Sequence, residues 1–131
     1  MKKNEKELLL RDLCARLPYG VMAKFGDSNP SKITNITQCI DSNSWFVESE
    51  SEFDGMTGEF DGMMCEINNV KPYLFPMSSI TIDQWNDFGE FTTNDTTYVG
   101  ANVDWFNKNH FDYRGLIPMG LAKDATGLNI Y

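Results

Sequence analysis

The residues best suited to do chemistry are four carboxylates in a duplicated stretch. The segment EFDGMTGEFDGMMCE, residues 52–66, contains nearly the same heptad twice, so Glu52, Asp54, Glu59 and Asp61 recur at matched positions. Clustered carboxylate oxygens are the ligands that calcium prefers. The spacing does not fit the calcium-loop pattern D-x-[DN]-x-[DN]-G with a glutamate at position twelve. The sequence therefore predicts no metal site here, and no pattern in it implies a cofactor.

The same stretch is also typical of turns. Asp-Gly pairs favour turns because glycine tolerates a positive φ angle and aspartate hydrogen-bonds to its own backbone. The structural interpretation is a hairpin excursion between two strands, in which Phe53 and Phe60 anchor two successive turns. The functional alternative is an acidic tip that binds a partner.

Charge is distributed unevenly along the chain. Of the 19 acidic residues, eight lie between positions 33 and 70, where there is no lysine or arginine, and the other eleven balance the 11 basic residues. The formal charge of −8 therefore lies in the middle third. The eight acids are Asp41, Glu48, Glu50, Glu52, Asp54, Glu59, Asp61 and Glu66. Because phosphate binding relies on lysine and arginine, we expect no direct binding of nucleic acid.

The single histidine, His110, supports a different hypothesis. It would act as a general base oriented by Asp104 or Asp112, with a cysteine as nucleophile. No cysteine or serine stands in a recognisable nucleophile motif, and G-x-G-x-x-G, P-loop, Cys-x-x-Cys and H-E-x-x-H patterns are absent from the sequence. The structural interpretation is a histidine near a helix end, packed among aromatic residues.

Three widely spaced cysteines, Cys14, Cys39 and Cys65, indicate free thiols in a reducing compartment. Charges interrupt the N-terminal leucine run too early for a secretory signal. No stretch approaches the roughly 18 uninterrupted apolar residues that a membrane span needs. We therefore expect a cytoplasmic protein that does not associate with membranes.

Helical periodicity appears first at residues 4–17, where an apolar stripe follows Asn4 as the expected cap. A second helix, residues 82–88, is expected after a capping box formed by Thr81 and Gln84, and Gly89 is expected to end it.

A C-terminal helical segment is expected in two parts. Asn102 caps a helix that reaches residue 109, and Asp112 caps a second short helix that Pro118 kinks.

Short segments rich in β-branched and aromatic residues predict strands at residues 20–25, 32–40, 45–50 and 63–70. The expected fold is a single α+β domain spanning residues 1–131. It contains a small curved antiparallel β-sheet or an SH3-like barrel, an N-terminal helix, a capped central helix and the C-terminal helical segment.

Three segments carry a resemblance: LLLRDLCARLPYGV (8–21), VKPYLFPMSSIT (70–81) and the C-terminal stretch that contains NHFDYRGLI. They resemble a family of short uncharacterised proteins encoded in gut-bacterial genomes and their phages and mobile elements. The resemblance implies a phage or mobile-element context, and it implies no catalytic residues.

The function hypothesis that follows is a non-catalytic protein-interaction module, which binds a basic protein surface through an acidic face within residues 41–66. The candidate binding residues are Glu48, Glu50, Glu52, Asp54, Glu59 and Asp61. One variant is mimicry of nucleic-acid charge. The non-functional interpretation is that the acidic surface only keeps the protein in solution. The alternative is an enzyme with a site around His110 and nearby carboxylates.

Overall fold

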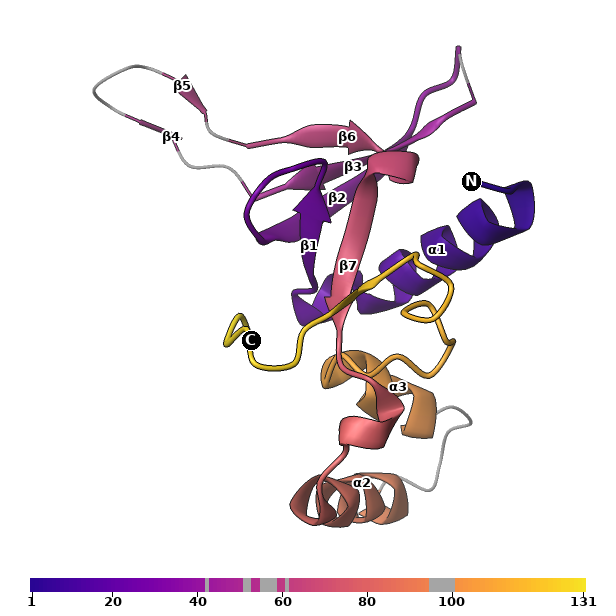
Figure 1. The fold of residues 1–131 in the computed structure, drawn as a ribbon, viewed down its shortest axis with the longest axis vertical. Helices are drawn as coiled ribbons and strands as arrows, with labels where there is room; N and C mark the ends of the chain where they lie inside the picture. The colour runs from indigo at the N-terminus through magenta and orange to yellow at the C-terminus, as the bar shows by residue number, and fades with distance from the viewer. Residues whose placement is uncertain (42, 51–52, 55–58, 61, 95–100) are drawn as a thin grey trace.

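The computed structural model describes residues 1–41, 43–50, 53–54, 59–60, 62–94 and 101–131. Its helices are α1 (Lys3–Arg16), α2 (Ile82–Asn94) and α3 (Ala101–Lys108). Its strands are β1 (Met22–Phe25), β2 (Ser31–Gln38), β3 (Trp45–Ser49), β4 (Phe53–Asp54), β5 (Glu59–Phe60), β6 (Met64–Glu66), β7 (Val70–Leu74) and β8 (Lys123–Asp124). The sheet and α1 form the upper part of the molecule in Figure 1, and α2 lies at the opposite end.

Six strands form one open sheet in the order β6-β3-β2-β1-β7-β8. Neighbouring strands are antiparallel except for β7 and β8, which are parallel. The predicted α+β fold with a small curved sheet is confirmed. The sheet is mixed and does not close, so it corresponds to the first of the two predicted forms and not to the barrel.

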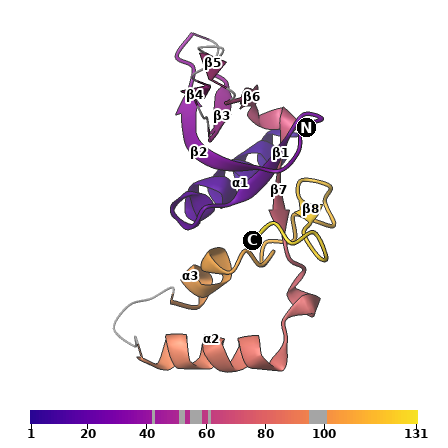
Figure 2. The same cartoon turned by 90° about the vertical axis from the view of Figure 1, so that its left-hand side faces the viewer.

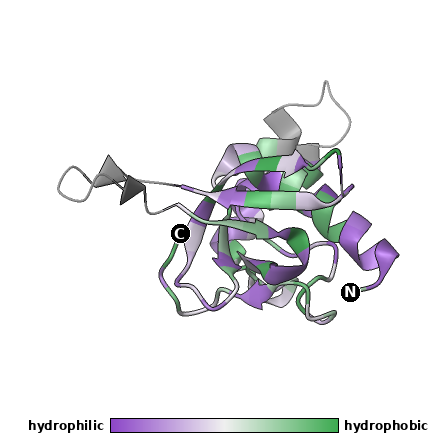
Figure 3. Cartoon of the chain, turned by 90° about the horizontal axis from the view of Figure 1, so that it is seen from above, coloured by the Kyte–Doolittle hydropathy of each residue, from purple (hydrophilic) through white to green (hydrophobic). Residues whose placement is uncertain are grey.

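The N-terminal helix packs its leucines against one face of this sheet. Leu9 and Leu13 are fully buried, and the helix runs from a hydrophilic start to a hydrophobic middle (Figure 3). It begins one residue earlier than predicted, because the backbone N–H of Lys2 donates to Glu5 Oε2 at 3.1 Å. Asn4 lies inside the helix, so its predicted role as cap is wrong.

The core lies between α1 and the sheet. On β3, Val47 and Ser49 are buried, whereas Glu48 belongs to the opposite face. This confirms the predicted alternation of that strand. The strand residues that join Leu9 and Leu13 in the core include Ala23, Phe25, Ile33, Val47, Val70 and Leu74. Figure 2 shows α1 running along the sheet beneath β1 and β2.

The strand predicted at residues 63–70 is in fact two strands. A 3-10 helix at Ile67–Asn69 separates β6 from β7. Strand β7 pairs with β1 on one side and with β8 on the other. It contains Pro72, which lies outside the predicted strands. Proline is tolerated because it removes only one donor from the ladder.

The predicted capping box is confirmed at the start of α2. The N–H of Gln84 donates to Thr81 Oγ1 at 3.1 Å, and the N–H of Thr81 donates to Gln84 Oε1 at 2.8 Å. The expected stop at Gly89 is wrong, because α2 continues to Asn94. Aromatic packing of α2 on α3 outweighs the cost of a glycine inside the helix, with Phe88 stacked on Phe106 at 5.3 Å.

The C-terminal part contains one helix of the predicted two. α3 covers most of the predicted range 102–109. Asp112 does not cap a second helix. Its two carboxylate oxygens accept the N–H groups of Leu116 and Ile117 at 2.8 and 2.9 Å, and these residues lie in turns that include Pro118. The proline ring prevents that segment from continuing as a helix.

Candidate functional site

The six predicted binding residues are distributed over β3 and the segment that follows it. Glu48, on β3, is partly exposed and stands opposite Met64, which is 62% exposed on β6. Glu50 follows the strand and is exposed. Glu52 and Asp61 lie outside the described residues. At its base, therefore, the predicted acidic face is open to solvent and adjoins an exposed methionine.

We call residues 48–61 the acidic arm. Within it, Phe53 is the register partner of Phe60, and Asp54 is the register partner of Glu59. Two residues of the first heptad therefore pair with two residues of the second in a separate two-stranded ladder. This confirms the predicted hairpin, whereas the two successive turns predicted at Phe53 and Phe60 involve residues 55–58 and 61, which lie outside the described residues. Figure 1 shows β4 and β5 well away from the six-stranded sheet.

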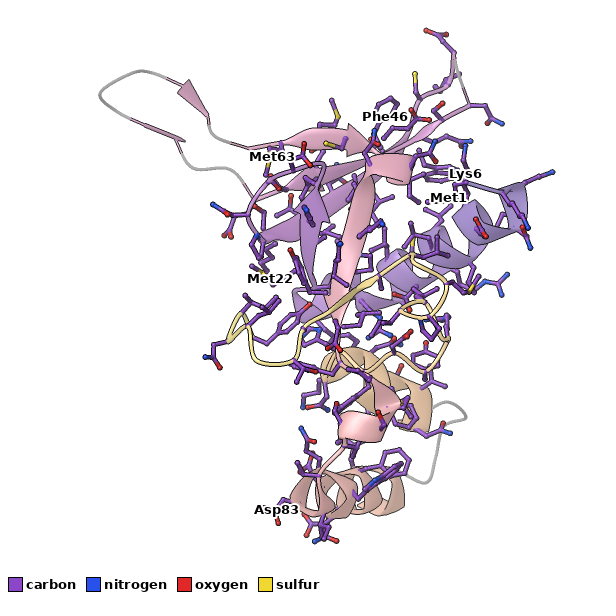
Figure 4. The ribbon with its side chains drawn as sticks, in the orientation of Figure 1. Met1, Lys6, Met22, Phe46, Met63 and Asp83 are labelled. Atoms are coloured by element: carbon purple, nitrogen blue, oxygen red, sulfur yellow. The ribbon has the colours of Figure 1, made fainter. Side chains whose placement is uncertain are left out.

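The base of the acidic arm is fixed by a buried serine. Ser49 donates its backbone N–H to the carbonyl of Met63 at 2.8 Å, and its hydroxyl oxygen accepts the N–H of Met63 at 2.7 Å. Figure 4 places Met63 where the arm leaves the sheet, with Asp83 at the other end of the molecule. The arm thus starts from an anchored pair of strands.

His110 lies in a packed environment. The residue is 8% exposed, and its ring stacks on the ring of Tyr131 with centroids 3.7 Å apart. Burial lowers the pKa of His110 to about 4, and the positive charge of Arg16 contributes in the same direction. Nδ1 has no hydrogen-bond partner in the described part of the chain, and both oxygens of Asp112 accept backbone N–H groups. The ring is therefore not oriented by Asp104 or Asp112 through Nδ1.

The state of Cys14 does not favour a cysteine nucleophile in the enzyme hypothesis. Burial raises the pKa of the Cys14 thiol, which reduces its thiolate fraction at neutral pH. Three surface cavities formed by described residues lie beside β1, beside α1 and beside Phe75, and His110 lines none of these three.

A buried ion triad next to His110 was not predicted. Asp12 Oδ2 accepts from Arg16 Nε at 2.9 Å, and Asp12 Oδ1 accepts from Arg114 Nη1 at 2.7 Å. Arg16 Nη2 also donates to the carbonyl of Phe111 at 2.6 Å. Both guanidinium groups lie over the ring of Tyr113, at 5.5 and 4.5 Å. These contacts join α1 to the C-terminal segment.

The sequence contains a signal for two members of this triad. Asp12 and Arg16 are four residues apart and lie on the face of Leu9 and Leu13, since positions three and four apart are neighbours on a helix. The partner Arg114 is about a hundred residues away, and no local pattern indicates it.

Tyr131 ties two central strands together beside His110. Its hydroxyl accepts the N–H of Met22 at 2.9 Å and donates to the carbonyl of Tyr73 at 2.7 Å. Burial raises the pKa of this phenol above its usual value, so the hydroxyl keeps its proton. Figure 4 shows Met22 beside the C-terminal segment.

A comparison with protein-family models, with curated proteins and with solved structures finds no match. The resemblance to proteins of gut bacteria and their phages therefore stays a prediction. Within the described ranges, no helix is long and apolar enough to cross a membrane, and no three His, Cys, Asp or Glu residues are grouped as metal ligands.

Proposed function

We propose that this protein is a non-catalytic interaction module that binds a basic protein surface through its acidic arm. The observation that carries the proposal is the ladder of β4 and β5, which extends the acidic segment beyond the sheet as a paired hairpin. A paired backbone holds acidic residues at defined positions, so the segment loses less conformational entropy when a partner binds.

The pairing itself favours a cationic partner. Asp54 and Glu59 occupy directly opposite positions of the ladder. Like charges at such positions destabilise a strand pair, and a basic partner that neutralises them stabilises the arm. Charge of one sign also steers a partner of the opposite sign during association.

The surroundings of His110 do not favour the enzyme alternative. A general base needs access to substrate and a pKa near the working pH, whereas His110 is buried and its pKa is lowered to about 4. The enzyme hypothesis stays a prediction without structural support.

The test compares two variants that lose the same charge. The arm variant carries Glu48→Gln, Glu50→Gln, Asp54→Asn and Glu59→Gln. The control variant neutralises four exposed acids outside the arm, namely Glu7, Asp27, Asp83 and Glu90. Each protein is immobilised, incubated with lysate of the source organism at low and moderate salt, and the retained proteins are identified.

We expect the arm variant to lose its basic partners while its thermal melt stays at or above that of the unmodified protein, because repulsion is relieved. The control variant should retain them. Equal capture by both variants would show that the arm only keeps the protein in solution. Retention that does not fall with salt would also contradict a charge-driven interface.

A further inference from the structure

Three lysines line one surface cavity of about 410 Å³. Lys24 comes from β1, Lys71 from β7 and Lys123 from β8, three adjacent strands of the sheet. The volume falls within the range of small-molecule sites. This cavity lies outside the acidic arm and takes no part in the proposed function.

The register places the three lysines on one face. Lys24 is the direct partner of Lys71, and Lys123 is the partner of Tyr73, two residues along β7 from Lys71. Partners across a ladder share a face, and so do residues two apart on a strand. Two lysines therefore occupy directly opposite positions of the ladder, and like charges at such positions destabilise a strand pair.

Little negative charge offsets this cluster, although the chain carries −8. The ion pairs within the described residues both involve Asp12, so no described carboxylate lies within 4.0 Å of these lysines. Asp27 is the one carboxylate among the described residues that line the cavity, and it is exposed. The cavity is thus a basic site in an acidic protein.

The cavity is also lined by the turn after β1 and by the 3-10 helix before β7. The N–H of Gly26 donates to the carbonyl of Asn69 at 2.8 Å, which holds the turn after β1 against the 3-10 helix. Next to it, Asn68 Oδ1 is buried without a hydrogen-bond partner in the described part of the chain. The turn after β1 and the 3-10 helix therefore form a fixed wall beside the lysines.

We propose that Lys24, Lys71 and Lys123 form a binding site for the phosphate group of a small phosphorylated molecule. Three ammonium groups and the Asp27 carboxylate together carry +2, which balances the charge of about −2 on a phosphate monoester. A long polyanion is disfavoured because the net charge of −8 repels it.

The test is a calorimetric and amide chemical-shift titration at low ionic strength, with inorganic phosphate, glycerol phosphate and glycerol as separate probes. The site variant is Lys24→Gln/Lys71→Gln. The matched control is Lys3→Gln/Lys6→Gln, which removes the same charge from the lining of another cavity, beside α1. Figure 4 shows Lys6 on α1, away from Met22 on β1.

We expect both phosphates to bind the unmodified protein and to shift amides of β1, β7 and β8, while glycerol does not bind. The site variant should weaken binding at least tenfold and melt no lower than the unmodified protein without ligand, since ammonium repulsion is gone. Tighter binding of glycerol phosphate than of inorganic phosphate supports an organic phosphate ligand, and equal binding supports free phosphate.

No binding of either phosphate, or equal weakening in the two double variants, would overturn the proposal. Binding of a single-stranded oligonucleotide without binding of either small phosphate would also overturn it. A failure here leaves the acidic arm untouched, because the two sites share no residue.

Discussion

At the scale of single residues, the hydroxyl of Thr81 has one defined task. It accepts the N–H of Gln84, one of the donors that the first turn of α2 cannot satisfy internally. We predict that Thr81→Ala lowers the free energy of unfolding by about 1 kcal/mol. Urea denaturation followed by circular dichroism measures this loss. Thr81→Ser is the control, because it keeps the hydroxyl and should stay close to the unmodified protein. If alanine and serine behave alike, the cap does not stabilise the fold.

The lowered pKa of His110 makes the stability of the protein depend on pH. The ring has a pKa of about 4 in the folded state and about 6.5 when unfolded. As pH falls, His110 takes up a proton in the unfolded chain before it does so in the folded protein. The contribution of the neutral ring to the free energy of unfolding is therefore complete above pH 6.5 and is lost as pH falls towards 4. We expect a loss of roughly 2 kcal/mol across this window, after allowance for partial solvent screening.

The matched variant for this pH effect is His110→Asn. The residue at this position has a φ angle of 63°, which asparagine adopts readily and most other residues do not. The variant removes the titrating ring, so its free energy of unfolding should change less between pH 6.5 and 4. Identical pH profiles for the two proteins would show that His110 is not kept neutral by the fold.

Residue-level prediction succeeded where both partners are close in sequence. The Thr81–Gln84 cap depends on residues three apart, and the pairing of Phe53–Asp54 with Glu59–Phe60 belongs to one hairpin. It failed for Asp12 and Arg16, because charged side chains are normally exposed unless paired. Their partners are Arg114 and the carbonyl of Phe111, which only the tertiary fold brings near.

Among the helices, α2 contains a glycine, Gly89, in its interior. A Cβ atom added at Gly89 would meet nothing within 4 Å. Alanine at an interior helix position is more favourable than glycine by about 1 kcal/mol. We therefore predict that Gly89→Ala raises the melting temperature, measured by calorimetry.

Gly115 provides the contrasting variant. It also has open space around its missing Cβ, but its φ angle is +76°, a region that strains alanine. Gly115→Ala should lower the melting temperature while Gly89→Ala raises it. A decrease for Gly89→Ala would mean that glycine is needed where α2 meets α3.

Among the strands, local pattern located β1, β2 and β3 but not β7. The first three alternate in polarity or are rich in β-branched residues. Strand β7 contains Lys71 and Pro72, which are poor strand formers. Its conformation depends on pairing with β1 and β8, each about fifty residues away in sequence. The lysine cavity could not be predicted for the same reason.

At the scale of the whole molecule, we predict that reducing agents leave stability unchanged. No disulfide joins Cys14, Cys39 and Cys65, all of which belong to the described residues. Excess reductant therefore removes no covalent constraint on the unfolded chain. Thermal melts with and without reductant should coincide, and a lower melting temperature under reduction would show a disulfide that forms in solution.

The pairing of β1 has a consequence for how the chain folds. On one side β1 meets β2, its neighbour in sequence, and on the other it meets β7, which begins at Val70. Closing a long loop costs entropy before the distant contacts offset it, so such pairings form late and slowly. We expect the β2–β3 hairpin to form early and the pairing of β1 with β7 to form in the rate-limiting step. Lys24 and Lys71 come together only when these two strands pair, so the lysine cavity exists only in the fully folded protein.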